Sequence, residues 1–366
     1  MKTGGALLWA PMKKELEFMK ALLLTAPGTL TMTDVDTPPC GDFDVVVRVA
    51  ACGICGSDIH GLDGSTGRRI PPLVMGHEAA GTVSQIGSQV RDIKKGARVA
   101  LDSTIACGAC NDCSSGRENL CISRQVLGVS CGTYRRHGCF AEYVVVPQHA
   151  VYVIPDSLTF VQASLLEPLT IALHALRLGG SGAHTNSAVV VGCGTIGLTL
   201  ISALAAKGCR AIAAIDIDAS RLATAKKHGA TIGFSGNDSD VAAGVVAWAK
   251  QHGSGDGADL VVEAVGTTAA VQIAIDSAAR GATVVLVGNV SPRIEFALQT
   301  VVTRQLRILG SCSSAGCYPE AIELVASGRV DLDHLVSRVA PLSEGAEWFR
   351  RLVQREDGLV KVVLEP

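Results

Sequence analysis

The stretch VVVGCGTIG, residues 189–197, ends an apolar run and sets Gly192, Gly194 and Gly197 in the spacing G-x-G-x-x-G. At a strand–turn–helix junction, the first glycine permits a tight turn, the second lets a pyrophosphate approach the backbone, and the third lets helix and strand pack closely. The helix N-terminus then offers free N–H groups and a positive dipole to phosphates. The stretch therefore predicts a dinucleotide-binding turn. The triplet alone also fits an ordinary turn, because the chain has 40 glycines.

The sequence around this turn alternates between strand and helix patterns. Strands are expected at 187–192, 211–216, 259–266 and 282–288, and helices at 195–208, 219–229 and 268–281. Such alternation with short connections predicts a doubly wound parallel sheet with helices on both faces. The second strand ends in Asp216, where a carboxylate can accept hydrogen bonds from a ribose 2′-hydroxyl and would repel a 2′-phosphate. NAD is therefore expected over NADP, although Arg221 could serve a 2′-phosphate.

Composition excludes several classes of protein. The 366 residues are 48% hydrophobic and 18% charged, so large cores are expected and disorder is not. A net charge of −2 and the lack of a dense Lys/Arg run argue against a nucleic-acid or membrane-surface partner. Residues 188–206 are apolar enough to suggest a membrane span, but their closely spaced glycines favour a strand, a turn and a helix.

The N-terminus and the cysteines bear on the cellular compartment. The first 24 residues do not form a signal-peptide pattern, and residues 1–18 are interpreted as an extension ahead of the first domain. Thirteen cysteines without an export signal indicate a reducing, cytoplasmic compartment. Clustered cysteines there are more often metal ligands than disulfides.

A four-cysteine loop, CGACNDCSSGRENLC at 107–121, carries the strongest metal signal. Four thiolates at this spacing can close around one tetrahedral Zn²⁺ and leave no position for substrate, which predicts a structural site. An iron–sulfur cluster is the alternative, but the loop lacks the C-x2-C-x2-C-x3-C-P pattern. The four expected ligands are Cys107, Cys110, Cys113 and Cys121.

A second stretch, ACGICGSDIHG at 51–61, permits three interpretations: a redox dithiol, part of a zinc site, or two buried thiols. It holds too few ligands for a closed site, and the next candidates are His77 and Glu78 in GHEAAG. One thiolate, one imidazole and one carboxylate would leave a zinc position open to water or substrate. Glu167 adds a carboxylate in an otherwise apolar helix, where an unpaired buried charge is costly and a metal or its water would be a partner.

The motifs together resemble one family. CGSDIH (55–60), GHEAAG (76–81), the four-cysteine loop, LLEPL (165–169) and VGCGTIG followed by Asp216 look like the zinc-dependent medium-chain dehydrogenases. Within these, the chain is similar to the sorbitol (L-iditol) and other polyol dehydrogenases, with threonine dehydrogenase close by. The resemblance covers the chain from about residue 19 to its end. It implies a GroES-like, mainly β catalytic domain around an inserted Rossmann domain, with expected boundaries of 1–166, 167–304 and 305–366.

The resemblance also assigns roles to residues. It makes Cys55 the ligand and Cys52 a buried bystander, with His77 and Glu78 as further ligands and Glu167 as the acid that binds the zinc or its water. Ser57 matches the hydroxyl that accepts the substrate's proton, and His60 a relay towards solvent. The NAD-lining positions that it implies, beside the three glycines, are Ile196, Asp216, Arg221, Val287, Gly288 and Asn289.

The expected enzyme therefore contains two zinc ions per chain, one catalytic and one structural, and oxidises a secondary alcohol of a small molecule with NAD⁺. The resemblance leaves the identity of the alcohol open, because Ser313 stands where the sorbitol enzymes carry an arginine. L-Threonine remains an alternative, as does a phosphorylated polyol held by Arg68 and Arg69, although an exposed loop pair is the simpler interpretation of these two arginines. A non-catalytic zinc and NAD binder would need no proton relay, and zincless quinone reductases would lack Cys55, His77 and the four-cysteine loop. The resemblance further implies a homo-oligomer, either a tetramer or a dimer.

Overall fold

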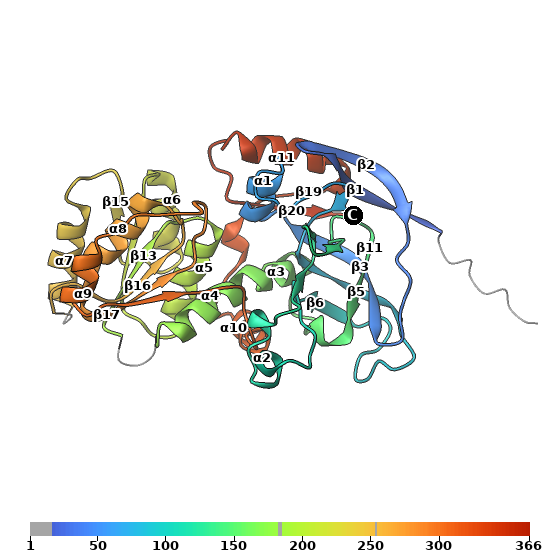
Figure 1. The fold of residues 1–366 in the computed structure, drawn as a ribbon, viewed down its shortest axis with the longest axis horizontal. Helices are drawn as coiled ribbons and strands as arrows, with labels where there is room; N and C mark the ends of the chain where they lie inside the picture. The colour runs from blue at the N-terminus through green and yellow to red at the C-terminus, as the bar shows by residue number, and fades with distance from the viewer. Residues whose placement is uncertain (1–16, 182–184, 253–254) are drawn as a thin grey trace, which may run out of the picture.

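The structure, a computed structural model, describes residues 17–181, 185–252 and 255–366. It consists of a mainly β lobe and an α/β lobe that lie side by side along the longest axis, with α4 between them (Figure 1). The expected extension at 1–18 lies almost wholly outside the described residues, and the first strand begins at Phe18. The described helices are α1 (Gly56–Gly61), α2 (Asn111–Ser114), α3 (Phe160–Ser164), α4 (Leu166–Leu178), α5 (Thr195–Ala206), α6 (Ala219–Lys227), α7 (Val241–Gln251), α8 (Thr268–Ser277), α9 (Leu298–Thr303), α10 (Tyr318–Ala326) and α11 (Gly345–Val353).

The β lobe is built around a seven-stranded sheet with the order β12-β6-β5-β3-β20-β19, in which β11 also pairs with β3. Its strands are β3 (Asp44–Gly53), β5 (Glu78–Ile86), β6 (Arg98–Leu101), β11 (Tyr143–Pro147), β12 (Val151–Val153), β19 (Val336–Pro341) and β20 (Lys361–Glu365). A second sheet has the order β2-β1-β4 and contains β1 (Phe18–Ala26), β2 (Thr29–Asp36) and β4 (Leu73–Val74). Two short ladders pair β7 (Thr104–Ile105) with β8 (Gln125–Val126) and β9 (Val129–Ser130) with β10 (Arg135–Arg136).

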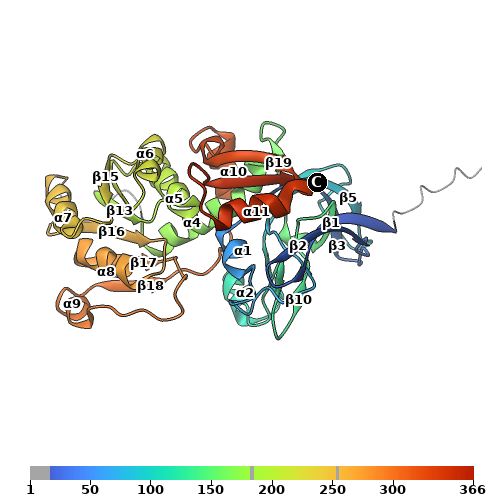
Figure 2. The same cartoon turned by 90° about the horizontal axis from the view of Figure 1, so that it is seen from above.

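The two ends of the chain meet in this lobe. The closing strand β20 runs antiparallel to β3, with Val363 opposite Gly53 and Leu364 opposite Cys52. Helix α11 packs beside α1 (Figure 2). The closing strand therefore belongs to the same sheet as strands from the N-terminal part of the chain. The pairing also brings the first residue of β20 to the place where β3 ends and β5 begins.

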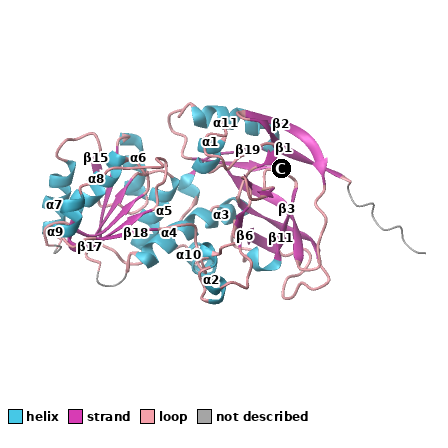
Figure 3. Ribbon diagram, in the orientation of Figure 1, coloured by secondary structure: helices cyan, strands magenta, loops and turns pink. Residues whose placement is uncertain are grey.

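The α/β lobe contains a six-stranded parallel sheet with the order β15-β14-β13-β16-β17-β18 (Figure 3). Its strands are β13 (Ser187–Val191), β14 (Ala211–Asp216), β15 (Ile232–Ser235), β16 (Ala258–Glu263), β17 (Ala278–Leu286) and β18 (Arg307–Gly310). Successive side chains of a strand point to opposite faces, and a sheet covered on both faces therefore buries both sets. Accordingly, Val190 packs in the core that includes residues of α4, α5 and α6, whereas Val189 and Val191 pack in the core that includes residues of α7 and α8.

The apolar stretch 188–206 forms β13, a turn and α5, as expected. No described helix has the length and apolar character needed to cross a membrane. Helix α8 was expected to run to residue 281 and instead ends at Ser277, because Ala278 already pairs with Ala258 as the start of β17. Strand β18 extends the parallel sheet beyond residue 304, the expected end of the inserted domain, and we propose placing that boundary after Gly310.

Candidate metal centre and dinucleotide cradle

The pairing of β3 with β5 creates the first candidate site. Gly53, the last residue of β3, lies opposite Glu78, the first residue of β5. A Cβ on Gly53 would lie 2.2 Å from Oε2 of Glu78, so glycine is required for this carboxylate to fold over the strand. Two residues later, Cys55 is the N-cap of α1. The register of two strands therefore brings together the two separate motifs CGSDIH and GHEAAG.

Cys55, His77 and Glu78 form a group of candidate metal ligands. One ligand atom of each lies within 4.8 Å of those of the other two, and the histidine and glutamate are buried. A thiolate, an imidazole and a carboxylate are donors that Zn²⁺ accepts, and three protein ligands leave a fourth position for water or substrate. Cys52 is fully buried among the apolar residues of the β-lobe core and is not part of the group. The residues present thus fit a catalytic zinc ion.

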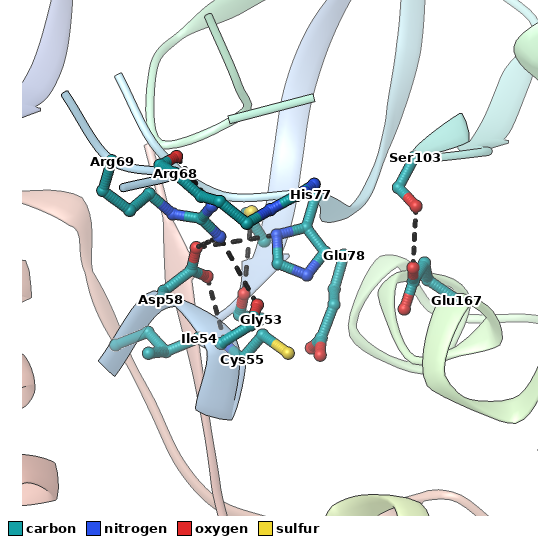
Figure 4. Close-up of polar contacts among 12 residues, drawn as sticks. Gly53, Ile54, Cys55, Asp58, Arg68, Arg69, His77, Glu78, Ser103 and Glu167 are labelled. Atoms are coloured by element: carbon teal, nitrogen blue, oxygen red, sulfur yellow. Dashed lines mark hydrogen bonds and ion pairs between the residues drawn. The ribbon is translucent and has the colours of Figure 1, made fainter. Parts of the chain in front are cut away.

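Glu167 lies near this group without joining it. It sits in the first turn of α4, 7% exposed, and its Oε1 accepts a hydrogen bond of 2.8 Å from Oγ of Ser103 (Figure 4). Burial raises the pKa of Glu167, and the nearby His77 offsets part of that effect. The expected contact of Glu167 with zinc or its water stays a prediction.

A buried lysine pairs with the candidate ligand Glu78. Nζ of Lys361, at the start of β20, lies 2.9 and 2.7 Å from the two carboxylate oxygens and donates to the carbonyl of Ile54 at 2.8 Å. Both side chains are 1% exposed. Burial alone would lower the pKa of Lys361, but Glu78 outweighs it and the pKa is raised. Sequence analysis missed this residue, although a lysine at the start of an apolar closing strand was a signal.

Behind His77 lies a second buried ion pair. Asp58 is fully buried, with Oδ1 2.9 Å from Nη2 of Arg69 and 3.6 Å from Nδ1 of His77. Burial would raise the pKa of Asp58, but His77 and Arg69 together lower it. Burial would likewise lower the pKa of His77, yet Asp58 and Cys55 raise it well above its usual value. Because Nδ1 faces Asp58, the other ring nitrogen is left for a metal, an arrangement common for zinc-binding histidines.

The two expected relay residues lie on α1. Ser57 and His60 are both exposed, and their spacing of three residues places them on one side of the helix. Nη2 of Arg69 lies 3.4 Å from Oγ of Ser57, a long hydrogen bond. The two adjacent arginines differ in burial: Arg68 is exposed, whereas Arg69 is only 3% exposed. Arg69 also forms the ion pair with Asp58. Sequence analysis missed the roles of both Asp58 and Arg69.

The four expected cysteines of the loop converge. Cys107, Cys110, Cys113 and Cys121 form a group of candidate metal ligands, and all thirteen cysteines of the chain are free. Sγ of Cys113 lies 3.9 Å from that of Cys107 and 3.5 Å from that of Cys110. Tetrahedral Zn–S bonds of about 2.3 Å place sulfur atoms roughly 3.8 Å apart, so these separations fit one zinc ion. Hydrogen bonds from the backbone and from Cys113 lower the pKa of Cys110 to about 6, which favours the thiolate needed to bind metal.

The glycine-rich turn has the form expected for a dinucleotide cradle. Gly192 has φ +93°, a conformation that favours glycine, and a Cβ on Gly197 would lie 1.8 Å from the carbonyl oxygen of Gly192. A Cβ on Gly194 would meet nothing within 4 Å, so the backbone there faces open space where a pyrophosphate could approach. Gly194 is also the N-cap of α5, whose first turn includes Ile196.

Asp216 lies at the end of β14, 8% exposed, beside this turn. Its Oδ2 accepts from the backbone N–H of Cys193 at 2.6 Å and its Oδ1 from that of Asp218 at 2.9 Å. These bonds fix the carboxylate next to the cradle, and each oxygen keeps a second lone pair for a ribose hydroxyl. Arg221 is directed to Asp218 instead, with 3.7 Å between Nε and Oδ2.

The remaining expected cofactor positions follow β17. The backbone N–H groups of Val287 and Gly288 donate to the carbonyl of Glu263 at 2.8 and 3.1 Å. A Cβ on Gly288 would lie 2.3 Å from backbone atoms of Val265 and Gly266, so this segment and the one after β16 touch. Asn289 continues the same segment. The structure thus places the expected cofactor residues at or beyond the carboxyl ends of parallel strands, where dinucleotides bind in open α/β sheets.

Comparison with known proteins gives matches along most of the chain. Residues 41–156 match the family "Alcohol dehydrogenase GroES-like domain", and residues 195–327 match "Zinc-binding dehydrogenase". The chain is 32% identical over 352 residues to sorbitol dehydrogenase of Bacillus subtilis, which covers 95% of this chain and 97% of that protein. It is 33% identical over 313 residues to D-xylulose reductase A of Aspergillus niger, with 84% and 86% covered.

Among solved structures, galactitol-1-phosphate dehydrogenase from Escherichia coli superposes with a TM-score of 0.86 at 27% identity and covers 95% of this chain and 100% of that one. The two family matches follow the order of the two lobes, and the relative in Bacillus subtilis is similar over almost its entire length. The chain is therefore an enzyme that belongs to the zinc-dependent medium-chain alcohol dehydrogenases, with a GroES-like catalytic domain and a Rossmann domain that binds a nicotinamide dinucleotide.

Proposed function

We propose that this enzyme oxidises a secondary alcohol of a polyol or a similar sugar alcohol to the ketone. The alcohol and NAD⁺ become the ketone, NADH and one released proton, which balances the reaction. The group of Cys55, His77 and Glu78 carries the proposal, because its donors suit zinc and leave a position open. Zinc at such a site acts as a Lewis acid that lowers the pKa of a hydroxyl group.

The chain's own residues supply the other functions of the site. Cys55, His77 and Glu78 hold the metal, with Glu167 close enough in the fold to approach it or its water. Lys361 neutralises part of the negative charge on Glu78, and Asp58 orients the ring of His77. Ser57 accepts the proton of the substrate hydroxyl, and His60 passes a proton on towards solvent; a bound cofactor would add its ribose hydroxyl to this relay.

The Rossmann domain orients the nicotinamide towards this site. Asp216, fixed beside the cradle by two backbone N–H groups, supports a preference for NAD over NADP. Arg221 is paired with Asp218, which supports the same preference. The four-cysteine loop holds the second, structural zinc ion.

The substrate pocket differs from that of the sorbitol enzymes at Ser313. Its hydroxyl lies 2.7 Å from that of Thr104, so a neutral pair of hydroxyls occupies this position rather than a cation. Of the two arginines that the sequence offered for a phosphate, Arg69 is committed to Asp58 and Arg68 is left. These contacts favour an uncharged polyol over its phosphate.

We infer further that the enzyme is a cytoplasmic homo-oligomer, a dimer or tetramer. Thirteen free cysteines suit a reducing compartment. Large apolar side chains are exposed along the segment from β17 to the end of α9: Val290, Phe296, Leu298 and Val302, with exposed fractions of 52%, 45%, 65% and 68%. Apolar clusters of this kind commonly mark contacts between subunits.

The test is NADH formation by zinc-loaded enzyme across free polyols, inositols, polyol phosphates, L-threonine and simple secondary alcohols, each with NAD⁺ and NADP⁺. A preference for a free polyol with NAD⁺ supports the proposal. A preference for L-threonine or for a phosphate ester would mean that this compound, and not a free polyol, is the substrate. The absence of turnover with two zinc ions bound would argue for a non-catalytic protein.

A further inference from the structure

We infer that Arg69 is a positioning residue for the reaction, whose guanidinium aligns the hydroxyl of Ser57 while anchored on Asp58. The inference rests on the proposed function, in which Ser57 accepts the substrate's proton. Arg69 belongs to neither cysteine motif and comes from the loop between them. Its buried side chain is the one described cation within hydrogen-bond distance of Ser57.

The fold provides a defined path for this side chain. The backbone of Arg69 bridges to Ser130, and the residues on either side of it form backbone hydrogen bonds of 3.1 Å with Ser130. From there the side chain passes α1 at Gly61, where a Cβ would lie 2.6 Å from Cγ of Arg69. Glycine at this position therefore makes the room that the arginine stem needs. The guanidinium then reaches the N-terminal half of α1.

The anchor is the ion pair with Asp58. Nη2 lies 2.9 Å from Oδ1, and the two side chains are 4% and 0% exposed (Figure 4). Nη1 donates to the carbonyl of Arg68 at 3.2 Å. A planar guanidinium held at two points has little freedom to rotate. The orientation of Nη2 is consequently set by contacts other than the one with Ser57.

The same Nη2 reaches Oγ of Ser57 at 3.4 Å. A hydroxyl has one O–H and two lone pairs. With one lone pair turned to Arg69, the second lone pair remains for the proton of the substrate and the O–H is free to donate outward to the relay. Hydrogen bonds at catalytic groups are often long before substrate binds and tighten in the complex.

Lysine cannot substitute for this arrangement. An ammonium group could keep the ion pair with Asp58, but it lacks the planar guanidinium that Nη1 anchors on the carbonyl of Arg68, so the direction of its N–H groups towards Ser57 is not fixed. Arg69→Lys therefore separates the proposed role from simple charge neutralisation. Arg280→Lys is the matched control, since Arg280 makes an exposed ion pair with Asp256 in the other lobe.

The experiment measures kcat, KM, zinc content and thermal unfolding of Arg69→Lys, alone and combined with Ser57→Ala. We expect Arg69→Lys to lower kcat about tenfold, within the range for groups that orient a reacting residue, with KM within twofold and two zinc ions retained. In the Ser57→Ala background, Arg69→Lys should alter kcat less than twofold, because the hydroxyl that Arg69 positions is absent. The solvent deuterium isotope effect on kcat should rise in Arg69→Lys as the proton step becomes slower.

An unchanged kcat in Arg69→Lys, or an equal loss with and without Ser57, would overturn the inference. Gly61→Ala serves if Arg69→Lys does not fold, since it keeps every charge and displaces the arginine stem, and the same pattern is expected. A wild-type enzyme that turns over no alcohol would refute the proposed function itself. An active wild-type enzyme, together with an Arg69→Lys variant whose kcat is unchanged, would refute this inference alone.

Discussion

The ammonium group of Lys361 lies 2.7 Å from a carboxylate oxygen of Glu78, although 283 positions separate the two residues in the sequence. The contact exists because β20, near the end of the chain, pairs with β3 and ends up beside the start of β5. The last strand thus completes the charge balance of a site whose candidate ligands come from the first quarter of the chain.

Lys361→Met should destabilise the metal-free enzyme by about 3 kcal/mol or more, because it leaves the carboxylate of Glu78 buried without a partner. Lys361→Arg keeps the charge and should cost less. Denaturant unfolding of the zinc-depleted proteins measures the difference. A loss below about 1 kcal/mol in Lys361→Met would mean that the pair matters little to the fold.

Asp102 predicts a dependence of stability on pH. Burial raises its pKa to about 7, whereas the ordinary value of 3.8 applies in the unfolded chain. The folded protein therefore binds this proton more tightly, and its contribution to stability is fully present below about pH 4 and is lost as pH rises towards 7. Asp102→Asn keeps an oxygen for the N–H of Thr104 and should be more stable than wild type at pH 7 by up to about 4 kcal/mol.

The check is chemical denaturation of Asp102→Asn and wild type at pH 4 and at pH 7. The two proteins should differ by less than about 1 kcal/mol at pH 4, where the carboxyl is protonated in the folded protein and about half ionised in the unfolded chain. A constant difference at the two pH values would contradict the raised pKa.

Cys110→Ser should remove one zinc ion per chain, because a tetrahedral site that loses a thiolate binds metal far more weakly. The loop packs on the rest of the enzyme through Asn119, which donates to the carbonyl of Cys312 at 2.9 Å. Loss of the ion should therefore also lower Tm. Elemental analysis and thermal unfolding measure both effects, and Cys131→Ser, outside either cluster, is the control expected to keep two zinc ions.

Asp216→Ser should reduce the preference for NAD⁺ over NADP⁺ by about tenfold to a hundredfold. The change removes a charged acceptor for the ribose hydroxyls, worth about 1.5–3 kcal/mol, together with repulsion of a 2′-phosphate. The ratio of kcat/KM for the two cofactors measures it. An unchanged ratio would place cofactor selection elsewhere.

The sequence predicted the elements that depend on local pattern. Strand β14 has the bounds expected for it, and the turn at Gly192 to Gly197 has the expected form, since a short apolar run and the conformations of glycines are properties of short segments. The predicted end of α8 was wrong, because the pairing of Ala278 with Ala258 is a tertiary contact that overrides a helical pattern.

In the candidate site, too, the residues in local motifs were predicted and those that depend on tertiary contacts were missed. Cys55, His77 and Glu78 lie in recognisable motifs, and the structure brings them together. Lys361 and Arg69 were missed because their contacts depend on strand pairing and on the path of a loop. No spacing in the sequence shows that one of two adjacent arginines is buried against Asp58.

The most direct test of the account is zinc-dependent recovery of NADH formation by metal-depleted enzyme, compared between Cys55→Ser and Cys52→Ser. The account predicts that added zinc restores turnover of the preferred alcohol in wild type and in Cys52→Ser, and that Cys55→Ser stays inactive. Full recovery in Cys55→Ser, or turnover that does not depend on zinc, would contradict a catalytic metal centre at Cys55, His77 and Glu78.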